Sequence, residues 1–278
     1  MKKIKSELIL EVSKKFKTSK GFSKTTKHFS HGIKQTTIKL TDINMAKKIG
    51  REVGTYVSLD FDEILYYDVA AKNLLCQKLE LSIKNLLKEM RIKAKKILVV
   101  GLGNEKYACD SFGKLTTDRI LITKPYLDRN LYDKSKLSEV YAVSLGVYGT
   151  TGFESSELIK SLCALVRPDV VIAIDSMLAE STHTLASSIQ ISNTKLLPGG
   201  GVGNNRKEIS EAVLGTKVIA LGIPMVVNLS SLCNVKDNLI VTPKDVEQKV
   251  LDLSKITAKA INLTFNKFTE KELTELTA

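Results

Sequence analysis

The chain has 278 residues, of which 43% are hydrophobic and 26% charged, so its composition excludes a disordered, collagen-like or coiled-coil protein. The formal net charge is +12, and no apolar run reaches the roughly 18 residues that a membrane-spanning helix needs. The four cysteines lie far apart without a CxxC pair, which indicates free thiols in a reducing compartment rather than disulfides or a zinc site.

Most of the positive charge lies in the first 50 residues, which contain 13 lysines and three acidic residues. A basic arm of this kind could bind nucleic acid or another polyanion. We favour a solvated, lysine-rich face instead, because the aromatic residues that bind single strands by stacking are sparse here. Direct nucleic-acid binding is therefore the alternative, and no membrane partner is expected.

In chain order, the sequence first predicts a β-rich stretch and then a long helix. Residues 6–12 fit either a short strand or the start of a helix. Residues 32–40 and 54–61 are rich in β-branched side chains and predict two strands. Apolar residues at helical spacing predict an amphipathic helix from Val69 to Met90.

Beyond this helix, apolar runs alternate with helical stretches. Residues 97–100, 140–145, 169–174 and 217–223 predict four strands buried on both faces, and residues 154–166 predict a helix between two of them. Such βα units are typical of a parallel sheet. The sequence therefore predicts an α/β fold with a mainly parallel sheet.

The last helix is predicted to begin at Thr242, with Thr242 as the capping residue, Pro243 at the first helical position and Asp245 three residues after the cap. We expect one α/β domain over residues 1–278. Within it, residues 1–62 form an added β-rich element and residues 95–266 form the α/β core.

Carboxylates follow two of the predicted strands, at the edge where parallel sheets gather their catalytic groups. Asp175 directly follows an apolar strand, and Asp110 lies in the loop after the first core strand. Neighbouring strands lie ~4.8 Å apart, so the two side chains could approach, share a proton and act as general acid and base on a water molecule. The alternative is that Asp175 caps a helix and Asp110 is an exposed loop acid.

Glycine-rich loops at the strand exits indicate places where the backbone approaches a ligand closely. The turn at residues 101–106 lacks the third glycine of a dinucleotide-binding fingerprint, because that position is Lys106. Residues 199–203, followed by Arg206, fit an anion cradle or a site for an extended peptide. The candidate substrate-binding residues are Gly103, Asn104, Gly149, Gly152, Gly201, Gly203 and Asn204.

Several colinear motifs together resemble the bacterial germination (spore) endopeptidase family. Residues 99–104 with Asp110 resemble the family's first signature, residues 171–175 resemble a second, and residues 198–210 are the most distinctive match. The resemblance implies an atypical aspartic-type endopeptidase whose two essential aspartates fall on Asp110 and Asp175.

The same resemblance implies further properties. The family degrades small acid-soluble spore proteins early in germination, forms homotetramers in the cytoplasm of the spore core or forespore, and needs no cofactor or metal. Its three-layer fold resembles that of the hydrogenase maturation proteases. The family enzyme is made as a zymogen that removes its own N-terminal segment. Here only residues 1–4 precede the stretch that resembles the mature start, so we expect no long pro-segment to be removed.

The chain also departs from the family pattern. A long insertion is missing around residues 229–239, asparagines stand at positions 193 and 228 where family aspartates are expected, and residues 176–180 are altered. Two alternatives therefore stay open. One is a non-catalytic homologue that binds spore proteins or a regulatory partner through the retained cleft. The other is a metal-dependent peptidase with the aspartates as ligands, against which the lack of a histidine cluster near His183 counts.

Overall fold

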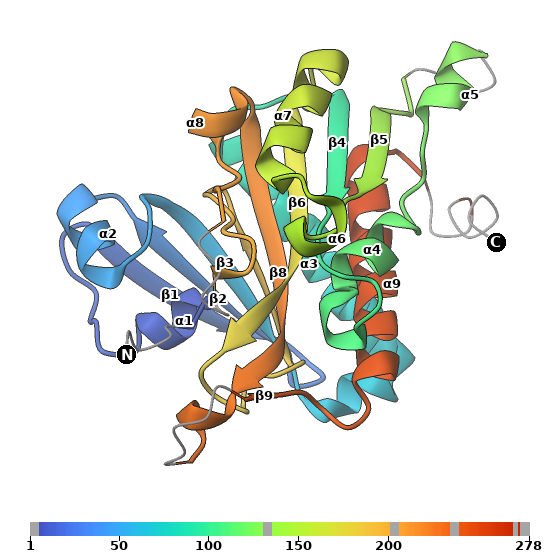
Figure 1. Ribbon diagram of the computed structural model, residues 1–278. Helices are drawn as coiled ribbons and strands as arrows, with labels where there is room; N and C mark the ends of the chain where they lie inside the picture. The colour runs from blue at the N-terminus through green and yellow to red at the C-terminus, as the bar shows by residue number, and fades with distance from the viewer. Residues whose placement is uncertain (1–5, 130–134, 201–205, 234–238, 269–271, 273–278) are drawn as a thin grey trace.

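Figure 1 shows the computed structural model, in which one sheet runs through the molecule. It describes residues 6–129, 135–200, 206–233, 239–268 and 272. The strands within these ranges are β1 (Phe22–His28), β2 (Lys34–Leu40), β3 (Gly54–Asp60), β4 (Lys96–Gly101), β5 (Glu139–Ser144), β6 (Val170–Ala179), β7 (Ser188–Ser192), β8 (Lys217–Asn228) and β9 (Ile240–Val241). Their order across the sheet is β1-β2-β3-β7-β8-β6-β4-β5, and β9 pairs with β8.

Helices cover both faces of the central strands, which gives three layers. One face carries α3, α4 and α9, and the other carries α7 and α8 (Figure 1). The helices are α1 (Ile9–Val12), α2 (Ile43–Ile49), α3 (Val69–Glu89), α4 (Phe112–Thr117), α5 (Lys124–Asp128), α6 (Tyr148–Thr151), α7 (Ser155–Val166), α8 (Glu211–Leu214) and α9 (Val246–Phe265), with 3-10 turns η1 (Glu63–Tyr66), η2 (Ala108–Asp110) and η4 (Leu229–Ser231).

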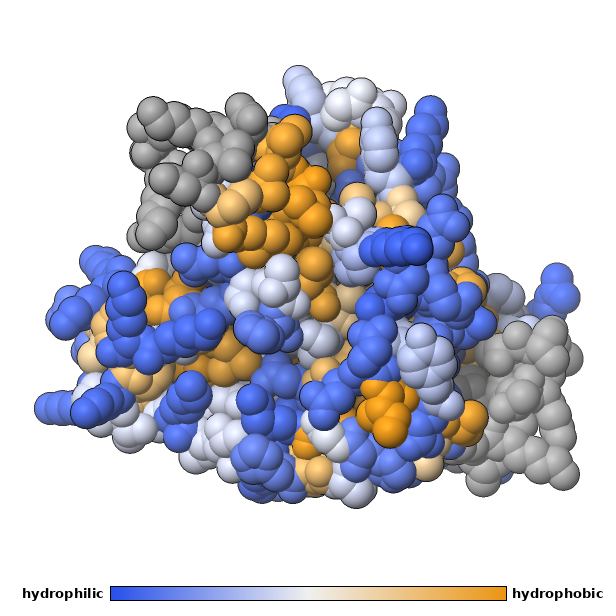
Figure 2. All heavy atoms as spheres, turned by 90° about the horizontal axis from the view of Figure 1, so that it is seen from below, coloured by the Kyte–Doolittle hydropathy of each residue, from blue (hydrophilic) through white to orange (hydrophobic). Residues whose placement is uncertain are grey.

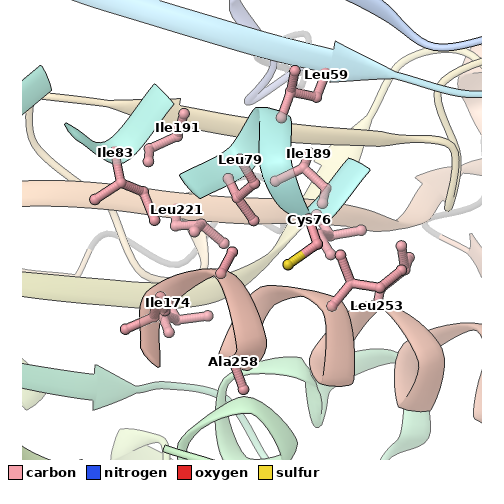
Figure 3. Packing of buried hydrophobic residues seen from close by; sticks show 14 of the residues in the cluster. Leu59, Cys76, Leu79, Ile83, Ile174, Ile189, Ile191, Leu221, Leu253 and Ala258 are labelled. Carbon is pink, nitrogen blue, oxygen red and sulfur yellow. The ribbon is translucent and has the colours of Figure 1, made fainter. Parts of the chain in front are cut away.

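The apolar runs of the sequence form these doubly covered strands. Along β4, Ile97 and Val99 pack toward α3 and α9, whereas Leu98 and Val100 pack toward α7. Each strand residue is thus buried whichever way it points, which is why the runs are continuous rather than alternating. Figure 3 shows the larger of the two interfaces, where side chains of α3 and α9 meet those of β6, β7 and β8.

The parallel part of the sheet consists of β5, β4, β6 and β8. The remaining pairings, from β1 through β3 to β7, from β7 to β8 and from β8 to β9, are antiparallel. The expectation of a mainly parallel sheet is therefore wrong: the sheet is mixed. The first three strands do not stand apart from the core, because β3 pairs with β7 and extends the same sheet.

We call residues 6–60 the N-terminal wing. It holds α1, β1, β2, α2 and β3 and lies at the left of Figure 1. The helices α1 and α2 pack on one face of its strands through a small apolar cluster that includes Ile9, Phe22, Ile38 and Ile49. The strand β1 was not predicted from the sequence, because six of its seven residues are exposed and it lacks an apolar pattern.

Two boundaries differ from the prediction in ways that affect the site. The strand β6 continues past Asp175 to Ala179, because β8 also continues and the two remain paired. The last helix begins at Val246 and not at Thr242, whose hydroxyl donates to the Met225 carbonyl at 2.9 Å. Within the described residues, no helix combines the length and apolar character needed to cross a membrane.

Candidate active site

A cavity of about 520 Å³ lies beyond the carboxyl ends of the parallel strands. Residues that follow β4 and β5 form part of its wall, and the outer halves of β6 and β8 form another part. Both predicted aspartates line this one cavity, together with Glu7, Ser176, Tyr148 and Arg206.

Asp110 ends the short turn η2 after β4, and the backbone around it is closely packed. Its Oδ2 accepts a hydrogen bond from the Asn104 amide at 2.7 Å. Gly103 has a φ of +106°, and a Cβ placed on it would lie 2.1 Å from the Asp110 carbonyl oxygen. Only glycine fits there. Gly103 and Asn104, which were predicted to bind substrate, therefore both hold Asp110 in place.

Asp175 lies within β6 and its residue is only 7% exposed. Its Oδ1 accepts a hydrogen bond from the Ser176 amide at 2.9 Å. Burial raises the pKa of Asp175 well above its ordinary value, and the negative charges of Asp110 and Glu7 raise it further. Burial also raises the pKa of Asp110, although the Asn104 amide partly opposes this. Asp175 therefore keeps its proton up to a higher pH than Asp110 does.

The two alternative roles for the aspartates do not fit this geometry. Asp175 is a strand residue and caps no helix, and Asp110 is partly buried at the cavity wall rather than exposed in a loop.

Sequence reasoning missed Glu7, which reaches the cavity from the wing. The Glu7 amide donates to the Leu178 carbonyl at 3.1 Å, and its Oε2 accepts from the Leu178 amide at 2.6 Å. Nearby, the buried carboxylate of Glu11 accepts hydrogen bonds from the amides of Glu180 at 2.7 Å and Ser181 at 3.1 Å. These contacts join positions about 170 residues apart in the sequence, so no local pattern indicates them.

Ser176 was likewise missed. Its hydroxyl is buried and has no hydrogen-bond partner among the described residues. The Ile174 carbonyl accepts a hydrogen bond from the Leu102 amide at 2.8 Å, so it points to the side of β4. Because carbonyl directions alternate along a strand, the Ser176 carbonyl points to the same side, where β4 has already ended. Ser176 thus places a buried hydroxyl without a partner among the described residues one residue from Asp175.

Positive charge lies on another part of the wall. The Arg206 guanidinium stacks on the Tyr148 ring, 4.4 Å from its centroid, and lies 3.5 Å from Glu154. Lys207 also lines the cavity and pairs with Glu157 on α7.

The remaining predicted residues divide into three groups. Gly149 lines the cavity, whereas Gly152 does not and instead ends α6 with a φ of +73°. Gly201, Gly203 and Asn204 lie outside the described residues.

The two asparagines at expected aspartate positions have structural partners. The Asn193 side chain accepts from the Thr55 amide at 2.7 Å, and that of Asn228 accepts from the Ser230 amide at 2.9 Å. In the part of the chain that the structure describes, no group of three or more His, Cys, Asp or Glu side chains is arranged to hold a metal ion.

The fold and the site define the class: an α/β protein with a mixed sheet whose strand ends bring two carboxylates to one cavity. The model of the germination protease family, peptidase family A25, matches residues 3–237. The chain therefore belongs to the germination protease family, which is a family of aspartic-type peptidases, and the resemblance expected from the sequence is confirmed.

Named relatives agree with this assignment. A germination protease of Clostridium perfringens (strain ATCC 13124) is 35% identical over 204 residues, which cover 73% of this chain and 62% of that protein. One from Caldanaerobacter subterraneus subsp. tengcongensis is 31% identical over 291 residues, covering 88% of this chain and 89% of that protein. The match thus spans less than two thirds of the length of the Clostridium perfringens relative.

Among solved structures, a [NiFe] hydrogenase maturation protease HycI from Thermococcus kodakarensis covers 65% of this chain and 98% of its own. The sequence identity is 15% and the TM-score is 0.37, so this likeness supports no argument about function.

Proposed function

We propose that the protein is an endopeptidase that cleaves small acid-soluble spore proteins, with Asp110 and Asp175 as its catalytic pair. One observation carries the proposal: in a chain of the germination protease family, Asp175 of β6 and Asp110 of the turn after β4 line the same cavity, and burial together with the charge of Asp110 raises the pKa of Asp175. A pair of carboxyl groups that shares one proton is the arrangement needed to activate water for peptide hydrolysis.

Asp110 and Asp175 differ in burial, and this difference assigns their roles in the reaction. Asp175, the more deeply buried, enters the reaction protonated, and Asp110 enters as the carboxylate. Asp110 takes a proton from water as the water oxygen bonds to the scissile carbonyl carbon, and Asp175 gives its proton to the carbonyl oxygen. When the C–N bond breaks, Asp110 passes its proton to the leaving amine and Asp175 recovers one from a hydroxyl of the intermediate. Both carboxyls return to their starting states.

Ser176 supports an extended substrate in this site. Its carbonyl points to the open side of β6, and its buried hydroxyl has no partner among the described residues. A peptide that runs in extended form past β6 would accept and donate backbone hydrogen bonds there, as strands added to a sheet edge do. The scissile bond then lies beside Asp175.

The decisive experiment incubates purified protein with a small acid-soluble spore protein, with and without a chelator. We expect cleavage that the chelator leaves unchanged and that Asp110→Asn and Asp175→Asn each remove. Cleavage lost on chelation would favour the metal-dependent peptidase. Binding without cleavage would favour the non-catalytic homologue, and either result would reject the proposal.

A further inference from the structure

The N-terminal wing holds a large positive charge that the site does not use. Residues 1–50 contain 13 lysines and only Glu7, Glu11 and Asp42 as acids. All three carboxylates are directed to backbone amides: Glu7 to Leu178, Glu11 to Glu180 and Ser181 just after β6, and Asp42 to Met45 at the start of α2. The acids of this region therefore serve the fold rather than its surface charge.

The lysines of the wing differ in their pairing from those of the rest of the chain. Of the ten between positions 14 and 48, Lys34 and Lys39 form ion pairs, with Asp60 and Glu89. Outside the wing, nine of the 20 lysines within the described residues form ion pairs, a larger share than the two of ten in the wing. Eight exposed wing lysines have no ion-pair partner in the described part of the chain, and we call them the lysine surface: Lys14, Lys15, Lys17, Lys20, Lys24, Lys27, Lys47 and Lys48.

Most of the lysine surface lies on one side of the wing. Phe16 contacts the Phe22 ring at a centroid distance of 6.3 Å, which holds the segment carrying Lys14 to Lys20 against the apolar cluster under α1 and α2. Lys47 and Lys48 lie in the last turn of α2, which covers the same cluster. Figure 2 shows hydrophilic side chains projecting from this part of the molecule, at the left of the view.

The composition of this surface indicates the kind of partner. The wing's phenylalanines and Tyr56 are buried or half-buried, so no Phe or Tyr ring is offered for stacking on unpaired bases. Between Lys14 and Lys48 the only exposed large hydrophobic side chain among the described residues is Ile43, whereas protein interfaces depend on buried apolar anchors. Flexible ammonium groups without such anchors suit a regular array of phosphates.

We propose that the lysine surface binds the phosphate backbone of double-stranded nucleic acid without sequence preference. The proposal is independent of the peptidase function, because the surface contains none of the residues that line the cavity. Binding of this type depends steeply on salt: each lysine–phosphate contact changes the slope of log K against log salt by about 0.9.

The test measures fluorescence anisotropy of a labelled duplex DNA of ~20 base pairs, long enough for several phosphate contacts, with the full-length protein from about 50 to 200 mM salt. Lys14, Lys15, Lys17 and Lys20 are changed together to Gln. The matched control changes Lys84, Lys114, Lys124 and Lys217, which are ion-paired outside the wing, to Gln. Both variants change the net charge equally. A third variant, Lys47→Gln with Lys48→Gln, probes the same surface from a different element.

We expect the four-lysine wing variant to bind at least ~10-fold more weakly at low salt and to lose about 3 in slope, while the control stays within about 3-fold. The α2 variant should show a smaller loss of both quantities. Equal weakening by wing and control variants would overturn the proposal, since net charge alone would then explain binding. Absence of duplex binding by the unchanged protein at 50 mM salt, or equally tight binding of polyglutamate, would overturn it as well.

Discussion

The wing and the α/β core belong to one sheet, yet a smaller share of the lysines is ion-paired in the wing. In the core, nine of the 20 lysines among the described residues form ion pairs, and at the cavity Asp175 is buried and Asp110 is partly buried. In the wing, the acids Glu7, Glu11 and Asp42 bind backbone amides, and the eight lysines of the lysine surface have no ion-pair partners among the described residues. The wing's other two acids, Glu52 and Asp60, form ion pairs. The same sheet therefore carries a cavity that holds two carboxylates and, several strands away, an exposed lysine-rich surface.

The two regions meet at several places, and two of these contacts shape the sheet and the cavity. The strand β3 pairs with β7, and the segment from Ser6 to Glu11 lies against the outer half of β6. Through this segment the wing supplies Glu7 to the cavity of the core. The predictions below test how far the division between the regions holds.

The largest effect is expected from Asp175→Asn. An amide of the same volume cannot hold or give the proton, so kcat should fall by ~10²–10⁴ while the fold is kept. Asp252→Asn is the matched control, because Asp252 is also buried in the core but pairs with Lys72 away from the cavity. Peptidase assays should show loss only in the first variant; a near-normal rate for Asp175→Asn would make Asp175 structural.

Gly103→Ala should lower activity indirectly, by displacing Asp110. The added Cβ meets the Asp110 carbonyl oxygen, so Asp110 must move and activity should fall at least ~10-fold. Gly215→Ala has the same left-handed strain with nothing within 4 Å. It should cost about 1–2 kcal/mol of stability and leave activity intact. Similar activity in both variants would show that Gly103 does not position Asp110.

Glu11→Ala tests the contacts between the wing and the core. It leaves the amides of Glu180 and Ser181 without their acceptor, and we expect a loss of about 3 kcal/mol in the free energy of unfolding. Asp42→Ala removes only a helix cap within the wing and should cost about 1 kcal/mol. Denaturant titration measures both. Equal losses would mean that the Glu11 contacts add nothing beyond an ordinary cap.

The raised pKa of Asp175 predicts a pH-dependent gain of stability in Asp175→Asn. The folded protein binds this proton more tightly than the unfolded chain, so the stability from Asp175 is complete below the unfolded pKa and is lost as the pH rises through the folded pKa. The variant should therefore melt at nearly the same temperature as the unchanged protein at pH 4 and a few degrees higher at pH 8. A gain of constant size at every pH would point to packing instead.

The smallest effect is expected when the four wing lysines, Lys14 to Lys20, are changed to Gln and a short peptide is the substrate. The lysine surface contributes nothing to the cavity, so kcat/KM should stay within about 2-fold. A larger loss in kcat/KM would mean that the charge of the wing influences the reaction in the cavity, and that the two regions do not act independently.

The core was largely predictable because its signals are local. Continuous apolar runs such as residues 97–100 can be buried only between two helical layers, and the motif positions of Asp110 and Asp175 bring both to the same sheet edge. The continuation of β6 was not predictable from Ser176 and Met177 alone, because it depends on pairing with the equally long β8.

The structure of the wing and of the outer cavity wall could not be predicted in this way, because it depends on contacts between distant parts of the chain. The strand β1 is held by its pairing with β2 and not by an apolar pattern of its own. Glu7 and Glu11 acquire their roles only through contacts with residues near position 180. The balance of charge was visible in the sequence, but the direction in which each acid points was not.

The composition of the cavity wall also determines when the site can form during synthesis. It is assembled from residues as far apart as Glu7 and Thr242, and the two aspartates precede the outer half of β8 in the chain. A chain still emerging from the ribosome has both carboxylates long before it has β8, without which β6 lacks a neighbour on that side. The cavity that holds the two aspartates is thus incomplete until Thr242 has been synthesised, so the two carboxylates are brought together only after the later part of the chain has folded.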